Sequence, residues 1–266
     1  MDLKLKDRVV LITGGSKGIG LAVAKEFLRQ EAQVIICGRS EERLKSALLE
    51  IKEEVSGAKV WGKSCDVTKL EDLEALVQFV TKTVGGVDVL INNAGAGSEE
   101  TNIEAPDEKW YHYWDLHVMS AIRLCRLCVP IMKSRPGEGV IINTASMCAT
   151  QPLYYEPIYN TTKAALNMYT KCLAAEVIKD NIRVSAISPG LVLTPDWYST
   201  AGKLSKKEGI TVQQYFDRIA HQMAPIDRFA SAEEMAYFYV FLASPLCSYC
   251  LGTNFHVDGG AIQVIE

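Results

Sequence analysis

The sequence predicts a doubly wound α/β fold, in which a parallel sheet of about seven strands carries helices on both faces. Short apolar runs rich in Val and Ile alternate with longer amphipathic segments along the whole chain. The runs are continuously apolar, as in parallel strands that are covered on both sides. No internal repeat, low-complexity tract or long linker divides the 266 residues. We therefore expect one domain over residues 1–266.

The elements follow one another in a regular order. The stronger strand patterns cover residues 9–12, 34–36, 87–91, 140–142 and 182–187, and weaker ones cover 59–64 and 253–257. The amphipathic segments predict helices at about 20–30, 41–55, 70–84, 109–133, 159–180 and 232–243. Strand–helix–strand units of this kind form right-handed crossovers, and ligands bind beyond the carboxyl ends of the strands.

The charge balance narrows the class of partner. The chain has 28 Lys and Arg against 32 Asp and Glu, a formal net charge of −4, which disfavours nucleic acid. No apolar run approaches the roughly 18–20 residues of a membrane span. The charged start at residues 1–8 leads directly into a short apolar run, unlike a signal peptide. We expect a cytoplasmic protein that acts on a small molecule, without a membrane or nucleic-acid partner.

The eight cysteines include two C-x-x-C pairs, Cys125/Cys128 and Cys247/Cys250. Together they offer four thiolates, the number that a structural zinc ion requires. The first pair, however, lies in an apolar helical pattern, where cysteine commonly serves as a small buried hydrophobe. We expect reduced, core-filling thiols and predict no metal site.

A glycine-rich segment, Thr13-Gly14-Gly15-Ser16-Lys17-Gly18-Ile19-Gly20, separates the first strand from the first helix. Glycine permits a tight turn and a close approach of backbone to a pyrophosphate. The N-terminus of the helix adds unpaired N–H groups and a positive dipole. The segment lacks the Gly-Lys-Ser/Thr ending of a P-loop. Its place between strand and helix predicts a dinucleotide-binding turn.

The end of the second strand indicates which dinucleotide binds. An acidic residue there would hold the adenosine ribose hydroxyls, whereas an arginine accommodates a 2′-phosphate. The sequence reads Cys37-Gly38-Arg39-Ser40, with no acid, and Lys17 offers a second cation. The alternative for Arg39 is a solvated surface charge. The pattern favours NADP(H).

Three polar residues indicate acid–base chemistry at the same edge of the sheet. Tyr159 and Lys163 are separated by four positions and share one helix face. A cation beside a phenol lowers the phenol pKa and makes it a usable acid or base. Ser146 follows the strand pattern that begins at residue 140, so its hydroxyl should face the ligand. A Tyr/Lys pair alone occurs often by chance; its value comes from the serine and the glycine turn.

Taken together, these motifs closely resemble the short-chain dehydrogenase/reductase family over essentially the full chain. The matching landmarks are the glycine turn, Asp66-Val67, Asn92-Asn93-Ala94-Gly95, Ser146 with Tyr159 and Lys163, Pro189-Gly190 followed by Thr194, and Val257-Asp258-Gly259-Gly260. The resemblance implies a Rossmann-type domain that interconverts a carbonyl and an alcohol with a nicotinamide cofactor. It makes Tyr159 the proton donor or acceptor and Ser146 the group that holds the substrate oxygen. Lys163 would lower the Tyr159 pKa and bind the nicotinamide ribose.

The resemblance and the glycine turn together imply a set of cofactor-binding residues along the carboxyl edge of the sheet. They are Gly14, Ser16, Lys17, Ile19, Gly20, Arg39, Ser40, Asp66, Val67, Asn93, Ala94, Gly95, Tyr159, Lys163, Pro189, Gly190, Val192 and Thr194.

One position departs from the family pattern. Where the family usually has an Asn that helps to hold a water linked to the lysine, this chain has His117. An imidazole both donates and accepts hydrogen bonds, so His117 can take part in a proton relay as a catalytic residue. Alternatively, it fills a core site while hydrogen-bonded to backbone.

The substrate side is expected to include a lid over residues 195–224, with one helix at 213–223 and hinges at Gly202 and Gly209. Together with Ser146 and Tyr159, we expect Tyr154, Tyr155 and Trp197 to line the substrate pocket. The aromatic residues between 110 and 114 are expected to pack their helix against the body. They are Trp110, Tyr111, Tyr113 and Trp114.

The leading hypothesis is an NADP(H)-dependent oxidoreductase that interconverts a ketone or aldehyde and a secondary alcohol. One alternative is an NAD-dependent dehydrogenase of a sugar, polyol or steroid alcohol, which Arg39 opposes. Another is a non-catalytic dinucleotide-binding sensor or scaffold, supported only by His117. Family members are usually homotetramers or dimers, so we expect a homo-oligomer. The residues do not identify the substrate.

Overall fold

The computed structural model describes residues 1–264 and contains one seven-stranded parallel sheet. Its strands are β1 (Val9–Thr13), β2 (Gln33–Gly38), β3 (Lys59–Ser64), β4 (Val89–Asn92), β5 (Gly139–Thr144), β6 (Ile182–Pro189) and β7 (Asn254–Val257). Their order across the sheet is β3-β2-β1-β4-β5-β6-β7. The predicted fold class is confirmed. Successive strands are added in one direction from β1 to β3 and in the opposite direction from β4 onward, which makes the carboxyl ends of β1 and β4 the topological switch point.

Helices connect the strands. They are α1 (Gly18–Arg29), α2 (Glu41–Glu54), α3 (Leu70–Val84), α4 (Asp107–Trp114), α5 (Ser120–Ser134), α6 (Pro157–Val177), α7 (Pro195–Glu208), α8 (Val212–Met223) and α9 (Ala232–Ala243). Four shorter helical turns are η1 (Asp115–Met119), η2 (Met147–Ala149), η3 (Ile178–Asp180) and η4 (Pro245–Cys247).

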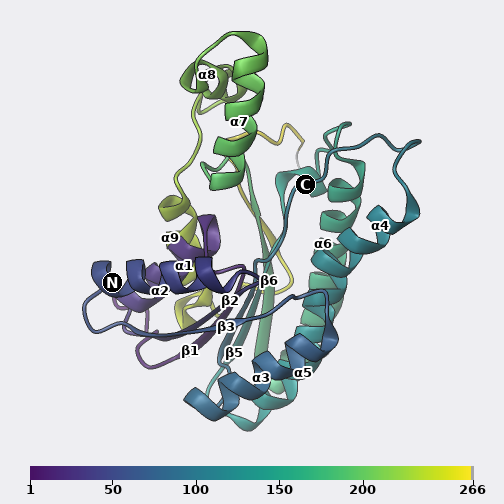
Figure 1. The fold of residues 1–266 in the computed structure, drawn as a ribbon. Coiled ribbons are helices and arrows are strands. Elements are labelled where there is room, and N and C mark those ends of the chain that lie inside the picture. Colours follow the sequence, from purple (N-terminus) through teal and green to yellow (C-terminus); the bar gives the residue numbers. More distant parts are fainter. Residues whose placement is uncertain (265–266) are drawn as a thin grey trace.

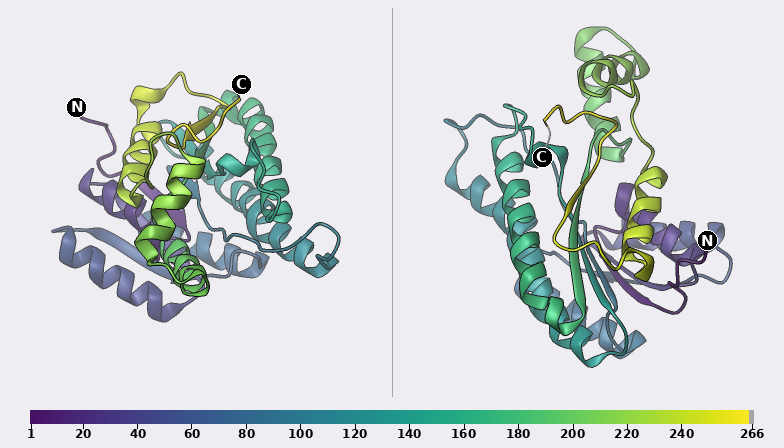
Figure 2. Two further views of the ribbon diagram at one scale, coloured as in Figure 1. Left: turned by 90° about the horizontal axis from the view of Figure 1, so that it is seen from above. Right: turned by 180° about the vertical axis from the view of Figure 1, so that it is seen from behind.

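The sheet separates two hydrophobic cores. Helices α1, α2 and α9 lie on one side of it and α3, α5 and α6 on the other (Figures 1 and 2). Alternate residues of β1 face opposite sides: Val10 and Ile12 pack with the first group, and Val9 and Leu11 with the second. A strand buried on both faces must be apolar at every position, which is why its sequence pattern is continuous.

The long helix expected over 109–133 is interrupted. Helix α4 ends at Trp114, and the π-helical turn η1 leads into α5. A π-helical turn between α-helical segments often marks a functional position, and η1 contains His117. Tyr113 packs against the core that contains α3, as expected. Contrary to expectation, Tyr111 is 68% exposed and Trp114 41% exposed.

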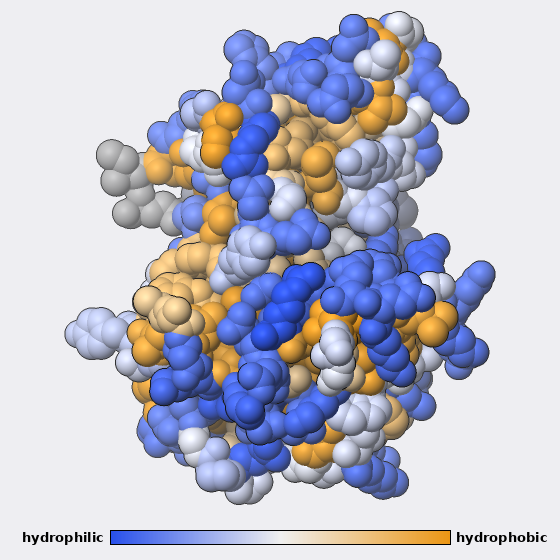
Figure 3. Space-filling view, turned by 90° about the vertical axis from the view of Figure 1, so that its left-hand side faces the viewer, coloured by the Kyte–Doolittle hydropathy of each residue, from blue (hydrophilic) through white to orange (hydrophobic). Residues whose placement is uncertain are grey.

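Residues 195–223 form two helices, α7 and α8, where a single helix was expected at 213–223. They stand together beyond the carboxyl edge of the sheet (Figure 1), and their outer surface is mainly hydrophilic (Figure 3). The expected hinge at Gly202 is wrong, since this residue lies inside α7. Gly209 ends α7 in the left-handed conformation, φ +71°, which favours glycine.

The two cysteine pairs lie in different cores. Cys125 and Cys128 are fully buried in α5, in the core that contains α3. Cys247 packs against the opposite core, beside α9. The four thiols therefore cannot share one zinc ion, and the core-filling interpretation is confirmed for Cys125 and Cys128. None of the helices within residues 1–264 is long and apolar enough to cross a bilayer.

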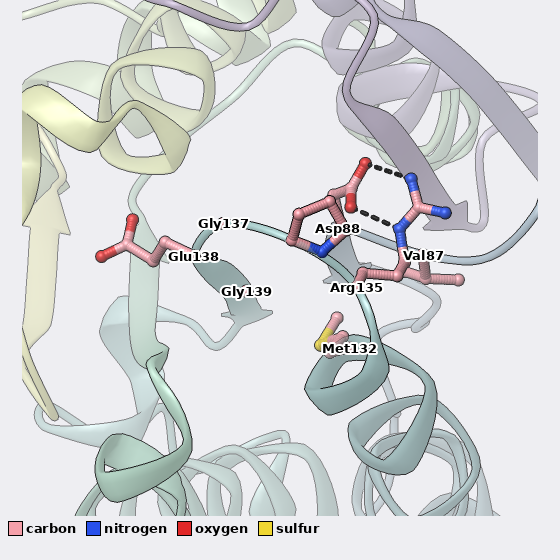
Figure 4. A pocket seen from close by; sticks show the side chains of 8 residues that line it. Val87, Asp88, Met132, Arg135, Gly137, Glu138 and Gly139 are labelled. Carbon is pink, nitrogen blue, oxygen red and sulfur yellow. Dashed lines mark hydrogen bonds and ion pairs between the residues drawn. The ribbon is translucent and has the colours of Figure 1, made fainter.

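Paired charged side chains lie at the amino edge of the sheet. Arg135 donates to both carboxylate oxygens of Asp88, at 2.6 and 3.0 Å (Figure 4). Arg183, only 2% exposed, donates to both oxygens of Glu138, at 2.7 and 3.0 Å. It also donates to the carbonyls of Leu242, in the last turn of α9, and of Ser244, directly after α9. Bidentate pairing of this kind satisfies charges that are removed from water and links β4, β5, β6 and α9.

Replacing Arg183 with Met should lower the free energy of unfolding by about 3 kcal/mol, because the Glu138 carboxylate then loses its partner inside the protein. Chemical denaturation monitored by circular dichroism measures the change. Lys59→Met is the control, because Lys59 pairs with Asp7 in an exposed ion pair and its loss should have a small effect. Equal destabilisation by the two variants would contradict the structural role of the buried network.

Candidate active site

The glycine turn brings backbone atoms closer together than any side chain would allow. A Cβ on Gly20 would collide with the carbonyl oxygen of Gly14, and one on Gly15 would lie 2.6 Å from the Ile36 side chain. Gly14 and Gly18 have positive φ angles of +66° and +55°. The N-terminus of α1 is therefore held open toward the switch point, a cradle that suits a pyrophosphate.

Hydrogen bonds connect the start of the glycine turn to the residues that follow β4. The Thr13 hydroxyl accepts hydrogen bonds from the backbone N–H groups of Asn93 and Ala94, both at 3.0 Å. The Asn93 side-chain amide donates to the Thr13 carbonyl, also at 3.0 Å. These bonds cross the switch point and hold Asn93, Ala94 and Gly95 beside the glycine turn.

The segment after β2 forms the other end of the expected dinucleotide site. Arg39 is exposed, and Ser40 caps α2 by accepting the N–H of Arg43. The Ser16 hydroxyl lies 3.0 Å from where a Cβ on Gly38 would be. Burial raises the pKa of Asp66, but hydrogen bonds from Thr68 and the charges of Arg39 and Lys69 bring it below its ordinary value. A cation and an ionised carboxylate thus flank this end of the site.

Lys17 has a partner that the sequence did not reveal. Its ammonium group lies 2.5 Å from the carboxylate of Asp196, in the first turn of α7. The ion pair joins the glycine turn to α7. Lys17 and Asp196 are 41% and 64% exposed, so the pair is weak in water.

Of the other residues expected at the cofactor, some pack in the interior and the rest lie at the end of β6 and in the loop that follows it. Val67 is buried, and Ile19 packs behind the glycine turn against the core beside α1. Two backbone contacts hold the loop after β6. The Gly190 N–H donates a hydrogen bond to the Val257 carbonyl, and Val192 forms a parallel β-bridge with Ala230. Pro189 ends β6, and Thr194 caps α7 by accepting the Trp197 N–H.

Ser146, Tyr159 and Lys163 converge at the carboxyl end of β5. Ser146 follows β5 and is 6% exposed, while Tyr159 and Lys163 occupy successive turns of α6. The Lys163 ammonium group donates to the Thr144 carbonyl at 2.6 Å and lies 5.6 Å from the centre of the Tyr159 ring. The helix therefore brings the phenol to the serine hydroxyl and the ammonium group to the end of β5.

Burial shifts the pKa of both ionisable groups away from the charged form. It lowers the pKa of Lys163 to about 8. It also raises the pKa of Tyr159 above its ordinary value, an effect that the Cys148 thiol adds to and a hydrogen bond with Ser146 opposes. At neutral pH Tyr159 carries its proton and can donate it.

His117 is buried, and both ring nitrogens have partners. Nε2 accepts the backbone N–H of Ala96 at 3.2 Å, and Nδ1 lies 2.8 Å from the Thr162 hydroxyl. Since Thr162 donates its own proton to the Tyr159 carbonyl, the assignment that fits is Nδ1–H donating to Thr162. Burial first, and the Lys163 charge second, hold the pKa of His117 well below its ordinary value. The neutral ring thus joins the Asn-Ala-Gly segment to α6.

The sequence analysis did not single out Glu156. This residue directly precedes α6 and is half-buried, with Oε1 3.0 Å from where a Cβ on Gly97 would be. Burial, then the nearby Glu100 and Glu99, raise its pKa to about 7. Its charge also acts on Cys148 and Tyr159. Its position three residues before Tyr159, directly ahead of α6, is the signal that could have revealed it.

The aromatic residues expected in the substrate pocket differ in how far they are exposed to solvent. Tyr154 is 91% exposed and Tyr155 45% exposed, and they stack edge to face on the loop before α6. Trp197 packs against Phe229, in the cluster that also contains Tyr159. Tyr154 and Tyr155 therefore lie at the surface before α6, and Trp197 lies partly buried at the start of α7.

Comparisons with known proteins agree with this geometry. The family model described as enoyl-(acyl carrier protein) reductase matches residues 14–261. The crystal structure of L-sorbose reductase from Gluconobacter frateurii, complexed with NADPH and L-sorbose, is similar with a TM-score of 0.97 and 50% identity, covering 100% of both chains. The uncharacterized oxidoreductase YvrD of Bacillus subtilis is 35% identical and covers 99% of each chain. A 3alpha-hydroxysteroid dehydrogenase of Mediterraneibacter gnavus is 33% identical, covering 98% of this chain and 99% of its own. The chain belongs to the short-chain dehydrogenase/reductase family of oxidoreductases.

Proposed function

We propose that this protein is an NADPH-dependent reductase that converts a polyhydroxylated ketone into the corresponding secondary alcohol. The observation that carries the proposal is the convergence of Ser146, Tyr159 and Lys163 at the carboxyl end of β5. The glycine turn between β1 and α1, a position that suits a pyrophosphate, is joined to the segment after β4 by hydrogen bonds between Thr13 and Asn93.

The three side chains have distinct roles in this chemistry. When bound, the nicotinamide cofactor supplies a hydride to the substrate carbonyl carbon. Ser146 and Tyr159 donate hydrogen bonds to the carbonyl oxygen, and Tyr159 passes its proton to the developing alkoxide. The buried Lys163 stabilises the phenolate that remains and holds the cofactor ribose. His117 is a positioning residue, because its two hydrogen bonds hold the Ala96 segment and α6 together.

Cofactor choice follows from the end of β2. Arg39 is exposed and no acid stands beside it in Cys37-Gly38-Arg39-Ser40, as recognition of a 2′-phosphate requires. Lys17 contributes less, because Asp196 already pairs with it. The similar L-sorbose reductase is complexed with NADPH, which supports the same choice here.

The substrate class follows from Glu156. A half-buried carboxylate beside Tyr159 accepts hydrogen bonds from hydroxyl groups and disfavours an apolar body. The similar reductase binds L-sorbose, a sugar. A steroid, as in the name of one relative, would place an apolar body beside this carboxylate. We therefore favour a ketose.

Replacing Tyr159 with Phe should lower kcat for ketose reduction by about 100-fold or more, because the proton donor is lost. Steady-state NADPH oxidation measures turnover, and nicotinamide fluorescence measures cofactor binding, which should persist. Tyr111→Phe, an exposed phenol on α4, is the matched control and should keep full activity. Retained turnover in Tyr159→Phe would exclude this mechanism and favour a non-catalytic dinucleotide sensor.

Replacing Arg39 with Asp should weaken NADPH binding by about 10–100-fold and shift preference toward NADH, because a charge-assisted hydrogen bond to phosphate is replaced by repulsion. Fluorescence titration with each cofactor measures the Kd values. Lys45→Asp makes the same charge change on the exposed face of α2 and should alter them little. An unchanged preference in Arg39→Asp would mean that another residue recognises the 2′-phosphate.

Replacing Glu156 with Ala should raise KM for a ketose by about 10–100-fold, the cost of losing a hydrogen bond to a charged acceptor. In the unmodified protein, KM should rise as pH falls below about 7, because the carboxylate takes up a proton. The variant should lose that dependence. Glu53→Ala, which removes an exposed carboxylate on α2, is the control. If both variants keep the original KM and its pH dependence, Glu156 does not contact the substrate.

A further inference from the structure

The Cys247/Cys250 pair lies in a tight turn between α9 and β7. The 3₁₀ turn η4 ends at Cys247, and the Cys250 N–H donates to the Cys247 carbonyl at 2.9 Å. This i to i+3 bond defines a four-residue turn, whose end Cα atoms lie less than about 7 Å apart. Disulfides span Cα separations of about 4.4–6.8 Å, so the turn suits a cross-link between its ends.

The two thiols interact and differ in access to solvent. Cys247 is 6% exposed and packs against the core beside α9, whereas Cys250 is partly exposed. Burial, followed by the neighbouring Cys250 thiol, raises the pKa of Cys247, while the Arg183 charge acts in the opposite direction. Tyr249 is fully exposed at the tip of the turn. A small disulfide in solution can therefore approach Cys250 first, with Cys247 beside it.

The turn is anchored on both sides. At its start, the Ser244 hydroxyl donates to the Leu3 carbonyl at 2.8 Å, and Arg183 donates to the Ser244 carbonyl at 3.1 Å. At its end, the Gly252 N–H donates to Val184 at 2.8 Å. A cross-link inside the turn leaves these backbone bonds in place, since only the two cysteine side chains need to reorient.

The other cysteines of the described residues do not combine these features. Cys125 and Cys128 have the same spacing but are buried within α5, where burial raises their pKa values. Cys172 is an exposed residue of α6 and has no second cysteine at the C-x-x-C spacing.

We propose that Cys247 and Cys250 form a redox-active dithiol that closes reversibly to an intramolecular disulfide on reaction with a low-molecular-weight disulfide. The Cys250 thiolate attacks one sulfur of oxidised glutathione and releases one glutathione thiolate. The Cys247 thiolate then attacks the Cys250 sulfur of the mixed disulfide and releases the second. The two cysteines are oxidised, oxidised glutathione is reduced to two thiols, and these take up the two protons that the cysteines lose. The proposal does not depend on the proposed function.

The test is mass spectrometry of the folded full chain after incubation with oxidised glutathione and alkylation of the remaining thiols. Trypsin cleaves after Arg228, and residues 229–266 contain no Lys or Arg and only these two cysteines. We expect this peptide to lose two hydrogen atoms, to resist alkylation and to regain both thiols with dithiothreitol. A peptide that keeps both thiols, or that stops at a glutathione adduct, would overturn the proposal whether or not Cys172 reacts.

Three variants separate closure of the turn from general thiol reactivity. Cys247→Ser should accumulate a glutathione adduct at Cys250, because the resolving thiol is absent. Cys250→Ser should leave Cys247 unmodified, since it is buried. Cys172→Ser, the matched control, should form the 247–250 disulfide as the unmodified chain does. A disulfide that appears only when Cys172 is present would show exchange from another site and would overturn the proposal.

Discussion

One buried ammonium group organises the candidate active site. Lys163 is 3% exposed, and a charge in that position requires a polar partner, which the Thr144 carbonyl supplies at 2.6 Å. Because Thr144 is the last residue of β5, this bond sets the position of α6 along the strand. Ser146, two residues beyond β5, and Tyr159, one turn before Lys163, are brought together as a result. The same burial lowers the pKa of Lys163 to about 8.

The cofactor side depends on close backbone approach. Gly20 packs on the Gly14 carbonyl, and Thr13 holds the Asn93 segment across the switch point. His117 then joins this segment to α6 through Ala96 and Thr162. A continuous set of hydrogen bonds therefore links the glycine turn to the helix that carries Tyr159. Rigid links of this kind hold reacting groups in place, which is a large part of what an active site contributes.

Buried charged side chains are paired at the amino edge of the sheet, but Lys163 and Glu156 at its carboxyl edge are not. At the amino edge, Asp88 and Glu138 are matched by Arg135 and Arg183 in bidentate pairs, which favour a single arrangement of strands. At the carboxyl edge, Lys163 and Glu156 are partly or fully removed from water without such pairing, and their pKa values move toward neutrality. Perturbed ionisable groups gather where chemistry occurs.

Local patterns in the sequence determined the sheet, the helices around it, the glycine turn and the serine, tyrosine and lysine. Each depends on residues close together in the chain: continuous apolar runs, glycines between strand and helix, and a four-residue spacing on one helix face. The tertiary structure alone decided that Lys17 pairs with Asp196 and that His117 uses both ring nitrogens. It also turned Tyr154 to solvent and gave Glu156 its raised pKa. These features arise from contacts between segments distant in sequence and from burial, and no local periodicity encodes either of them.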